Sequence, residues 1–223
     1  MKVTTDAILF GAWCGKRGVQ HILDIGAGTG LLSLMMAQRH QKAQVIGVEV
    51  EEGAAAQAGE NVKNSSFSKQ VSIVQSDIQS FRPSHLFDLI VCNPPFFQDH
   101  LVSNAQARRV ARHDIALSLS ELVEIVEKLL DPTGRFQVML PFKEAELLVE
   151  LTNGKLRVEK ICLVRASSGK APHRKFLSLA KEDVTMGTME LSIRDLSQHY
   201  TREFYQLTIP FLEDRYFAGK MPD

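Results

Sequence analysis

The chain has 223 residues, of which 44% are hydrophobic and 23% are charged, a composition typical of a globular protein with a large core. Its 26 basic and 26 acidic residues cancel, so a nucleic-acid partner is neither required nor excluded and would need a local basic patch. The three cysteines form no CxxC pair, and neither a signal-peptide core nor a membrane-spanning apolar run occurs. We therefore expect a cytoplasmic protein without disulfides, a metal site or membrane contact.

Strand and helix patterns alternate along the chain, and no linker-like stretch interrupts them. In chain order, they predict a strand at 21–26, a helix at 31–39, a strand at 44–50, a helix at 52–64, strands at 71–75 and 87–92, a helix from Ser118 or Ser120 to Leu130, a strand at 135–140, a helix at 143–151, and strands at 156–164 and 175–180. This alternation predicts an α/β fold with a parallel sheet covered on both faces.

We expect one domain over residues 1–223. Its core, residues 1–142, would bind a cofactor and carry a substrate elbow, and residues 143–223 would add strands and a helix that complete the sheet. Residues 97–115 and 166–174 fit neither pattern, and long irregular loops in compact α/β domains are often functional.

A glycine-rich turn follows the first predicted strand and opens the first predicted helix. Its sequence, Asp-Ile-Gly-Ala-Gly-Thr-Gly at 24–30, places Gly26, Gly28 and Gly30 where the backbone can turn tightly and approach a ligand. The nicotinamide fingerprint G-x-G-x-x-G would need glycine where Leu31 stands. On its own, the turn is equally consistent with a connection that binds nothing.

Acidic side chains end the next two predicted strands. Glu49 ends the second, at the position where open α/β sheets bind ligands, and its carboxylate can accept both hydroxyls of a ribose. Asp77 ends the third and can accept from an adenine amino group, with Ile78 packing on the ring. The alternatives are a solvated carboxylate for Glu49 and a turn cap for Asp77.

The tetrapeptide Asn-Pro-Pro-Phe follows the fourth predicted strand at 93–96. Neither proline has a backbone N–H, so the strand must end there in a rigid elbow. The elbow presents the amide of Asn93, the carbonyl of Pro94 and the aromatic face of Phe96, a combination suited to a planar base that carries an amino group. Phe97 either stacks on the base too or is a packing aromatic.

The order of these motifs resembles that of class I S-adenosylmethionine-dependent amino-methyltransferases: D-x-G-x-G-x-G, a strand-end acid, a strand-end Asp and N-P-P-F, over about residues 1–142. The opening Lys-Val-Thr-Thr-Asp-Ala-Ile-Leu-Phe-Gly-Ala-Trp at 2–13 is similar to that of the tRNA1(Val) (adenine-N6)-methyltransferase family. Pro-His-Arg at 172–174 and residues 200–205 also resemble that family.

The resemblance implies a Rossmann-like fold with a mostly parallel seven-stranded sheet and a late antiparallel hairpin. It implies S-adenosyl-L-methionine as the cofactor and the exocyclic amine of a tRNA adenine, adenine 37 beside the anticodon, as the acceptor. The implied catalytic residues are Asn93, Pro94 and Phe96. The implied cofactor-binding residues are Asp24, Gly26, Gly28, Gly30, Glu49, Asp77, Ile78, Thr5 and Asp6. Asp6 is alternatively only the cap of a helix that starts near residue 7.

Two basic clusters are the expected contacts with RNA phosphates, alongside Phe97 as a contact with the base. One lies in the loop after the elbow and the other in the later irregular stretch: Arg108, Arg109, Arg112, His173 and Arg174. The alternative interpretation of each charge is a solvated surface.

Several other functions are compatible with parts of this pattern. A methyltransferase acting on a glutamine amide of a protein or on DNA adenine would need the same elbow. A nicotinamide-dependent oxidoreductase and a non-enzymatic RNA-binding module are more distant alternatives. Cys92 is interpreted as a small buried hydrophobe rather than a cytosine-methylating nucleophile. The oligomeric state is open, with a monomer favoured.

Overall fold

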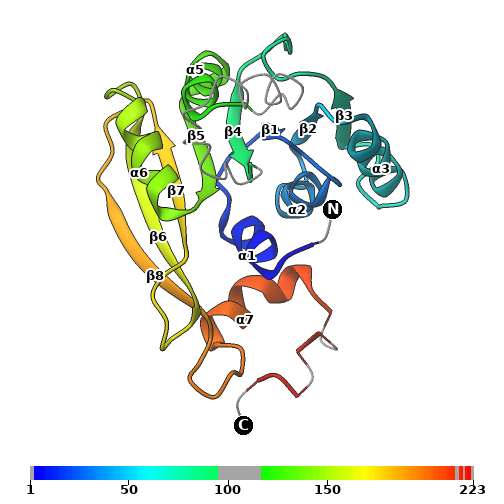
Figure 1. Ribbon diagram of the computed structural model, residues 1–223. Coiled ribbons are helices and arrows are strands. Elements are labelled where there is room, and N and C mark those ends of the chain that lie inside the picture. Colours follow the sequence, from blue (N-terminus) through cyan, green and yellow to red (C-terminus); the bar gives the residue numbers. More distant parts are fainter. Residues whose placement is uncertain (1–2, 95–116, 214–215, 218, 222–223) are drawn as a thin grey trace, which may run out of the picture.

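A twisted sheet of eight strands forms the centre of the computed structural model, which describes residues 3–94, 117–213, 216–217 and 219–221 (Figure 1). The strands lie in the order β3-β2-β1-β4-β5-β7-β6-β8. Their bounds are β1 His21–Ile25, β2 Gln44–Glu49, β3 Val71–Gln75, β4 Phe87–Cys92, β5 Leu130–Leu140, β6 Arg157–Ser167, β7 Arg174–Ala180 and β8 Gly187–Arg194. Neighbours from β3 to β5 are parallel, and β7 is antiparallel to both β5 and β6. The predicted α/β sheet with a late antiparallel hairpin is confirmed.

The predicted number of strands, seven, is one too few for the described residues. The additional strand is β8, which lies at the outer edge of the sheet and pairs with β6 in parallel, from Lys160↔Gly187 to Ser167↔Arg194. The first four residues of β8 are exposed, so the strand lacks the continuous apolar run of a buried strand. This strand forms through its pairing with β6, a contact between distant parts of the sequence that a local pattern does not predict.

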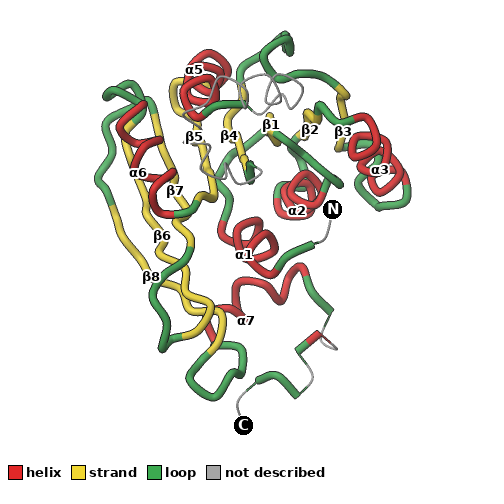
Figure 2. The backbone as a smooth tube through the Cα atoms, viewed as in Figure 1, coloured by secondary structure: helices red, strands yellow, loops and turns green. Residues whose placement is uncertain are grey.

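Helices cover both faces of the sheet, as the alternation predicted (Figure 2). Their bounds are α1 Thr5–Trp13, α2 Leu31–Arg39, α3 Glu52–Lys63, α5 Leu119–Leu129, α6 Phe142–Leu151 and α7 Arg202–Thr208, which continues into a 3-10 turn at Ile209–Phe211. Within the described ranges, none of these helices combines the length and the apolarity needed to cross a membrane.

Two apolar clusters hold the layers together. On one face, α1, α2 and α7 pack through side chains such as Phe10, Met36 and Phe204, all at most 1% exposed. On the other face, α5 and α6 pack through side chains such as Leu122 and Leu148, both 0% exposed. Burying side chains of this size stabilises the fold by about 1.5–3 kcal/mol each.

Most predicted boundaries lie within a few residues of the observed ones, and the largest difference is at β5. Of the two cap candidates for α5, Ser118 is the one used: its hydroxyl accepts from the Glu121 N–H, and Glu121 caps Ser118 in return. The strand then begins at Leu130 rather than at Arg135, because Leu130 already pairs with Phe87 before an irregularity in the register.

The register brings the carboxyl ends of the parallel strands to one edge of the sheet. Ile25 at the end of β1 lies between Val48 of β2 and Cys92 of β4. The same edge continues through β5, β7, β6 and β8, by the pairs Leu140↔Lys175, Val164↔Arg174 and Ser167↔Arg194. Parallel α/β sheets bind their ligands at this edge, so the functional residues should be sought along it.

Candidate active site

The glycine-rich turn leaves the end of β1 and is tied to the neighbouring strand. The backbone N–H groups of Gly26 and Ala27 both donate to the carbonyl of Val48, at 2.9 and 3.1 Å. Gly26 has φ +72°, and a Cβ built on it would meet nothing within 4 Å. Gly30, at φ +83°, is the N-cap residue of α2. The turn therefore needs glycine for its backbone conformation, and it borders open space on the side of Gly26.

Asp24 belongs to the strand that leads into this turn and is fully buried. The Ser33 hydroxyl donates to its Oδ2 at 2.7 Å, whereas Oδ1 has no hydrogen-bond partner among the described residues. Burial raises the pKa of this carboxyl to about 6, against the opposing effect of the Ser33 hydrogen bond. A buried acceptor without a partner is costly, so the free oxygen is a candidate contact for a ligand.

Glu49 is held by backbone donors on both sides of its carboxylate. The Gly28 N–H donates to Oε2 at 2.8 Å, and the Glu51 N–H donates to Oε1 at 3.0 Å. Its side chain is nearly buried, with the residue 9% exposed, so the solvated strand-end acid is the wrong interpretation. Each oxygen keeps a second lone pair, so the carboxylate can still accept from a ligand hydroxyl.

Asp77 and Ile78 follow β3 at the same edge. The Oδ1 atom of Asp77 accepts from the Gln79 N–H at 2.9 Å, which is the turn cap considered as an alternative. Ile78 is buried against the α5 side of the sheet. Their contact with an adenine ring stays a prediction.

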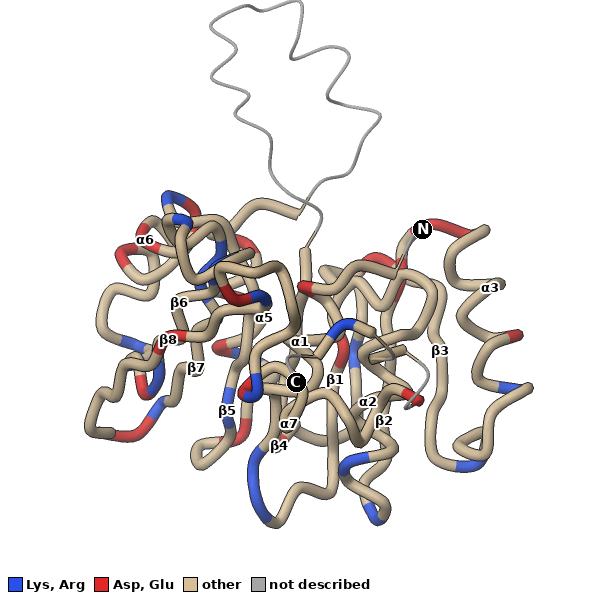
Figure 3. Tube along the Cα trace, turned by 90° about the horizontal axis from the view of Figure 1, so that it is seen from below, with Lys and Arg blue, Asp and Glu red and all other residues tan. Residues whose placement is uncertain are grey.

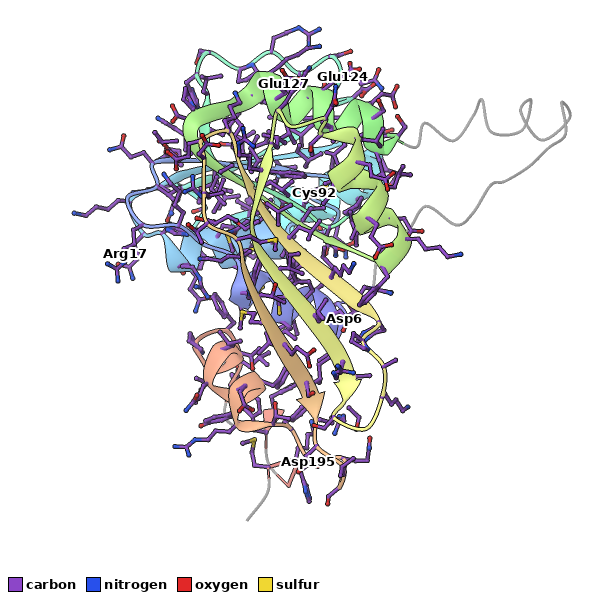
Figure 4. All side chains as sticks on the ribbon, turned by 90° about the vertical axis from the view of Figure 1, so that its left-hand side faces the viewer. Asp6, Arg17, Cys92, Glu124, Glu127 and Asp195 are labelled. Carbon is purple, nitrogen blue, oxygen red and sulfur yellow. The ribbon has the colours of Figure 1, made fainter. Side chains whose placement is uncertain are left out.

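The elbow begins where β4 ends, next to β1. Asn93 is half-buried and Pro94 is buried. Cys92, which precedes them, is 1% exposed, lies in the interior (Figure 4) and has its thiol pKa raised well above the usual value by burial, so it is a poor nucleophile. The remaining predicted residues of this region lie outside the described residues: Phe96, Phe97, Arg108, Arg109 and Arg112.

In the opening segment, the alternative interpretation of Asp6 as the helix cap is wrong. Thr4 is the N-cap residue of α1, and its hydroxyl accepts from the Ala7 N–H at 3.2 Å. Asp6 instead faces the other end of the chain: its Oδ2 lies 3.0 Å from His173 Nε2 and 4.0 Å from Arg174 Nε. Thr5 is half-buried beside it. A predicted cofactor residue and two predicted RNA residues are thus brought together.

Two residues of the site were missed from the sequence. Ser33, in the first turn of α2, orients Asp24. Gly47, inside β2, lets that helix approach, since a Cβ there would lie 2.7 Å from Ser33 Oγ and 2.9 Å from Ala27 Cβ. An isolated glycine within a β-branched strand is a known sign of such a close approach, so Gly47 was detectable. Ser33 was not, because nothing local distinguishes it from a surface serine.

The chain is similar in sequence to known methyltransferases. The family model "Methyltransferase small domain" matches residues 13–140. The tRNA1(Val) (adenine(37)-N6)-methyltransferase of Tolumonas auensis is 38% identical over 213 residues, which cover 95% of this chain and 90% of that protein. The enzyme of the same name from Actinobacillus pleuropneumoniae serotype 5b is 39% identical, with the same coverage.

Solved structures resemble the chain at the level of the fold. A predicted O-methyltransferase from Agrobacterium tumefaciens has a TM-score of 0.73 at 16% identity, covering 91% of this chain and 95% of that one. A glycopeptide N-methyltransferase complexed with S-adenosyl-L-methionine has a TM-score of 0.58 at 13% identity, covering 80% and 94%. At this identity, the likeness concerns the arrangement of the sheet and helices.

Proposed function

The chain belongs to the tRNA1(Val) (adenine(37)-N6)-methyltransferase family, and on that premise we propose that it methylates the exocyclic amine of adenine 37 in a tRNA, with S-adenosyl-L-methionine as the methyl donor. The observation that carries the proposal is the buried Asp24 carboxylate with one unpartnered oxygen, in the strand that leads into an open glycine turn. Asn93 follows β4, the strand beside β1, and so belongs to the same edge of the sheet.

The residues around the turn fit the proposed cofactor. The open space beside Gly26 can receive a ligand close to the backbone, and the free Oδ1 of Asp24, two residues earlier, offers a buried acceptor. Glu49 is fixed by two backbone donors and would accept from the ribose hydroxyls. Asp77 and Ile78 would hold the adenine. Thr5 and Asp6 line the cavity beside His173 and are left out of the cofactor site.

When bound, S-adenosyl-L-methionine supplies a methyl group made electrophilic by its sulfonium. The acceptor nitrogen of adenine is a weak nucleophile, because its lone pair is delocalised into the ring. The Asn93 side-chain oxygen and the Pro94 carbonyl would each accept one amino hydrogen and turn the lone pair out of the ring plane. So oriented, the nitrogen would take up the methyl group that the sulfonium supplies, the sulfur would keep the electron pair of the broken bond, and the surplus proton would leave the nitrogen afterwards. Positioning is therefore the main contribution of the elbow.

Phe96 would stack on the target base, at about 1–3 kcal/mol by typical base–aromatic values. The base must leave its stack to reach the elbow, which is cheaper in an anticodon loop than in a duplex. The proposal includes Phe97, Arg108, Arg109, Arg112, His173 and Arg174 as RNA contacts, a single methyltransferase domain, a monomeric state and a cytoplasmic location, where tRNA is found.

The test compares three acceptors under one set of conditions. The purified chain is incubated with labelled S-adenosyl-L-methionine and unmodified tRNA, total protein or DNA, and the nucleosides of the tRNA are analysed by mass spectrometry. We expect N6-methyladenosine in the tRNA and background label elsewhere. Label in protein or DNA with none in tRNA would overturn the assignment of the acceptor.

A further inference from the structure

A cavity of about 350 Å³ lies between the start of α1 and the carboxyl ends of β6 and β8. Thr4 and Asp6 line it on one side, His173 lies at the β6–β7 turn, and Arg194 and Tyr200 line the other side. In Figure 4, the labels of Asp6 and Asp195, the residue after Arg194, mark these two regions of the chain. The cavity belongs to the same edge of the sheet as the candidate active site, because Ser167 pairs with Arg194 there.

Arg194 is held in place by an aromatic support. Its guanidinium lies over the ring of Tyr200, 4.3 Å from the ring centroid, and its Nη1 donates to the carbonyl of Gln198. Tyr200 is itself 3% exposed, is stacked on Phe204 and shares a hydrogen bond of 3.0 Å with the hydroxyl of Tyr216. A cation stacked on a buried ring loses little further freedom when it binds a ligand.

The charges around the cavity leave Arg194 uncompensated. Asp6, the acidic residue in the lining, already faces His173 and Arg174. Among the residues that the structure describes, the Arg194 guanidinium forms no ion pair with a carboxylate. Figure 3 shows both basic and acidic residues scattered over the described chain, so overall charge does not select a binding face. A fixed guanidinium beside threonine hydroxyls is instead a specific match for a phosphate group.

We propose that this cavity binds a backbone phosphate of the tRNA, away from the methylated nucleotide, through Arg194 with support from Tyr200. The inference rests on the proposed function. Four strand-to-strand steps separate β4, which carries Asn93, from β8, which carries Arg194. At about 4.8 Å per step, the cavity lies roughly 19 Å along the edge from the elbow. That separation is too large for the phosphates of the target nucleotide, so the contact falls in the adjoining part of the anticodon arm.

Binding of unmodified tRNA to Arg194→Ala, followed by fluorescence anisotropy between 50 and 200 mM salt, tests the inference. We expect about a tenfold higher Kd and a salt slope smaller by about 0.7–0.9, the loss of one phosphate contact. The KM for tRNA should also rise about tenfold while kcat is unchanged. The Kd for S-adenosyl-L-methionine should stay within about twofold of the wild-type value. Arg194→Lys, which keeps the charge without the planar stack, should restore the salt slope and only part of the affinity.

Arg17→Ala is the matched control. Arg17 is exposed in the loop before β1, at the opposite edge of the sheet (Figure 4). Its substitution by alanine removes the same charge from the chain. Unchanged tRNA affinity and salt slope in Arg194→Ala, or an equal loss in Arg17→Ala, overturns the inference while leaving the proposed function in place. A wild-type chain that methylates protein or DNA and does not bind tRNA overturns both.

Discussion

The glycine turn and the Arg194 cavity lie at one edge of the same sheet and are built in opposite ways. The turn, Asp24 and Ser33 come from ten consecutive residues of one strand–turn–helix unit, closed by the neighbouring strand β2. The cavity combines residues near 4–6, 166–173 and 193–200, with Tyr216 behind them. The first site is encoded locally, and the second exists only when the chain termini and the late strands have packed together.

The two sites also differ in their electrostatics. Asp24 is buried with an unpartnered oxygen, so its charge is costly in the protein without ligand. The Asp6–His173 pair has side chains 22% and 32% exposed, and partly exposed pairs contribute about 0–1 kcal/mol. Changes at the first site should therefore alter catalysis and stability strongly, and changes at the second should be small for stability. The following variants test that contrast.

The largest effect is expected for Asn93→Ala at the elbow. Its side-chain oxygen is proposed to orient the acceptor nitrogen, and removing one preorganised group of this kind costs about 10²–10³ in kcat. The Kd for S-adenosyl-L-methionine should be nearly unchanged, since the turn is intact. Single-turnover methyl transfer and calorimetry measure the two quantities. Activity close to that of the wild type would remove Asn93 from the mechanism.

Asp24→Asn should remove a dependence of stability on pH. The pKa of Asp24 is about 6 in the folded chain, against an ordinary value near 3.8, so the folded state binds the proton more tightly. The contribution of Asp24 to the free energy of unfolding is then fully present below about pH 4. It is lost as the pH rises through about 6, and the complete loss is about 3 kcal/mol. Urea unfolding at pH 4.5 and 7.5 should show about 2 kcal/mol of this loss in the wild type and not in the variant, because part of it has already occurred at pH 4.5.

Ser33→Ala sharpens the same test. The Ser33 hydrogen bond lowers the pKa of Asp24, so its loss should raise that pKa further and extend the window of falling stability to higher pH. Parallel pH profiles for wild type and Asp24→Asn would show that the buried carboxyl has no such role.

The same contrast explains what the sequence could predict. Strand ends, the glycine turn and the elbow depend on short-range patterns, and the α/β class with helices on both faces of the sheet followed from them. The interpretation of Asp6 as the cap of α1 was wrong, because Thr4 caps this helix and Asp6 is paired with His173, 167 residues away. Arg194 and Tyr200 were not recognised as a pair, because their role depends on a neighbouring turn and on the C-terminal segment. Contacts of this range leave no periodic pattern in the sequence.

Gly47→Ala should destabilise the glycine-turn region by overpacking. The added Cβ would lie 2.7 Å from Ser33 Oγ, 2.9 Å from Ala27 Cβ and 2.9 Å from Ile73 Cδ1, so α2 must shift away from β2. Overpacking of this kind typically costs about 1–3 kcal/mol, and the displaced turn should also bind S-adenosyl-L-methionine more weakly. Gly59→Ala in α3 is the control, because a Cβ there meets nothing within 4 Å, and it should stabilise the chain by about 0.5–1 kcal/mol. Equal changes of stability in the two variants would contradict the close approach of α2 to β2 at Gly47.

Tyr216→Phe should have the smallest effect on stability, and this effect should be confined to the region of the Arg194 cavity. The variant removes the 3.0 Å hydrogen bond to Tyr200, worth about 1 kcal/mol of unfolding free energy. Burial, followed by that hydrogen bond, raises the pKa of Tyr200 to about 12, so the variant should lower it when tyrosine ionisation is followed by absorbance. Tyr205→Phe, which keeps the edge-to-face ring contact with Phe217, is the control. The Kd for S-adenosyl-L-methionine should stay at the wild-type value in Tyr216→Phe. A weakened cofactor site there would mean that the two regions are coupled through α1, whose neighbours include both α2 and α7.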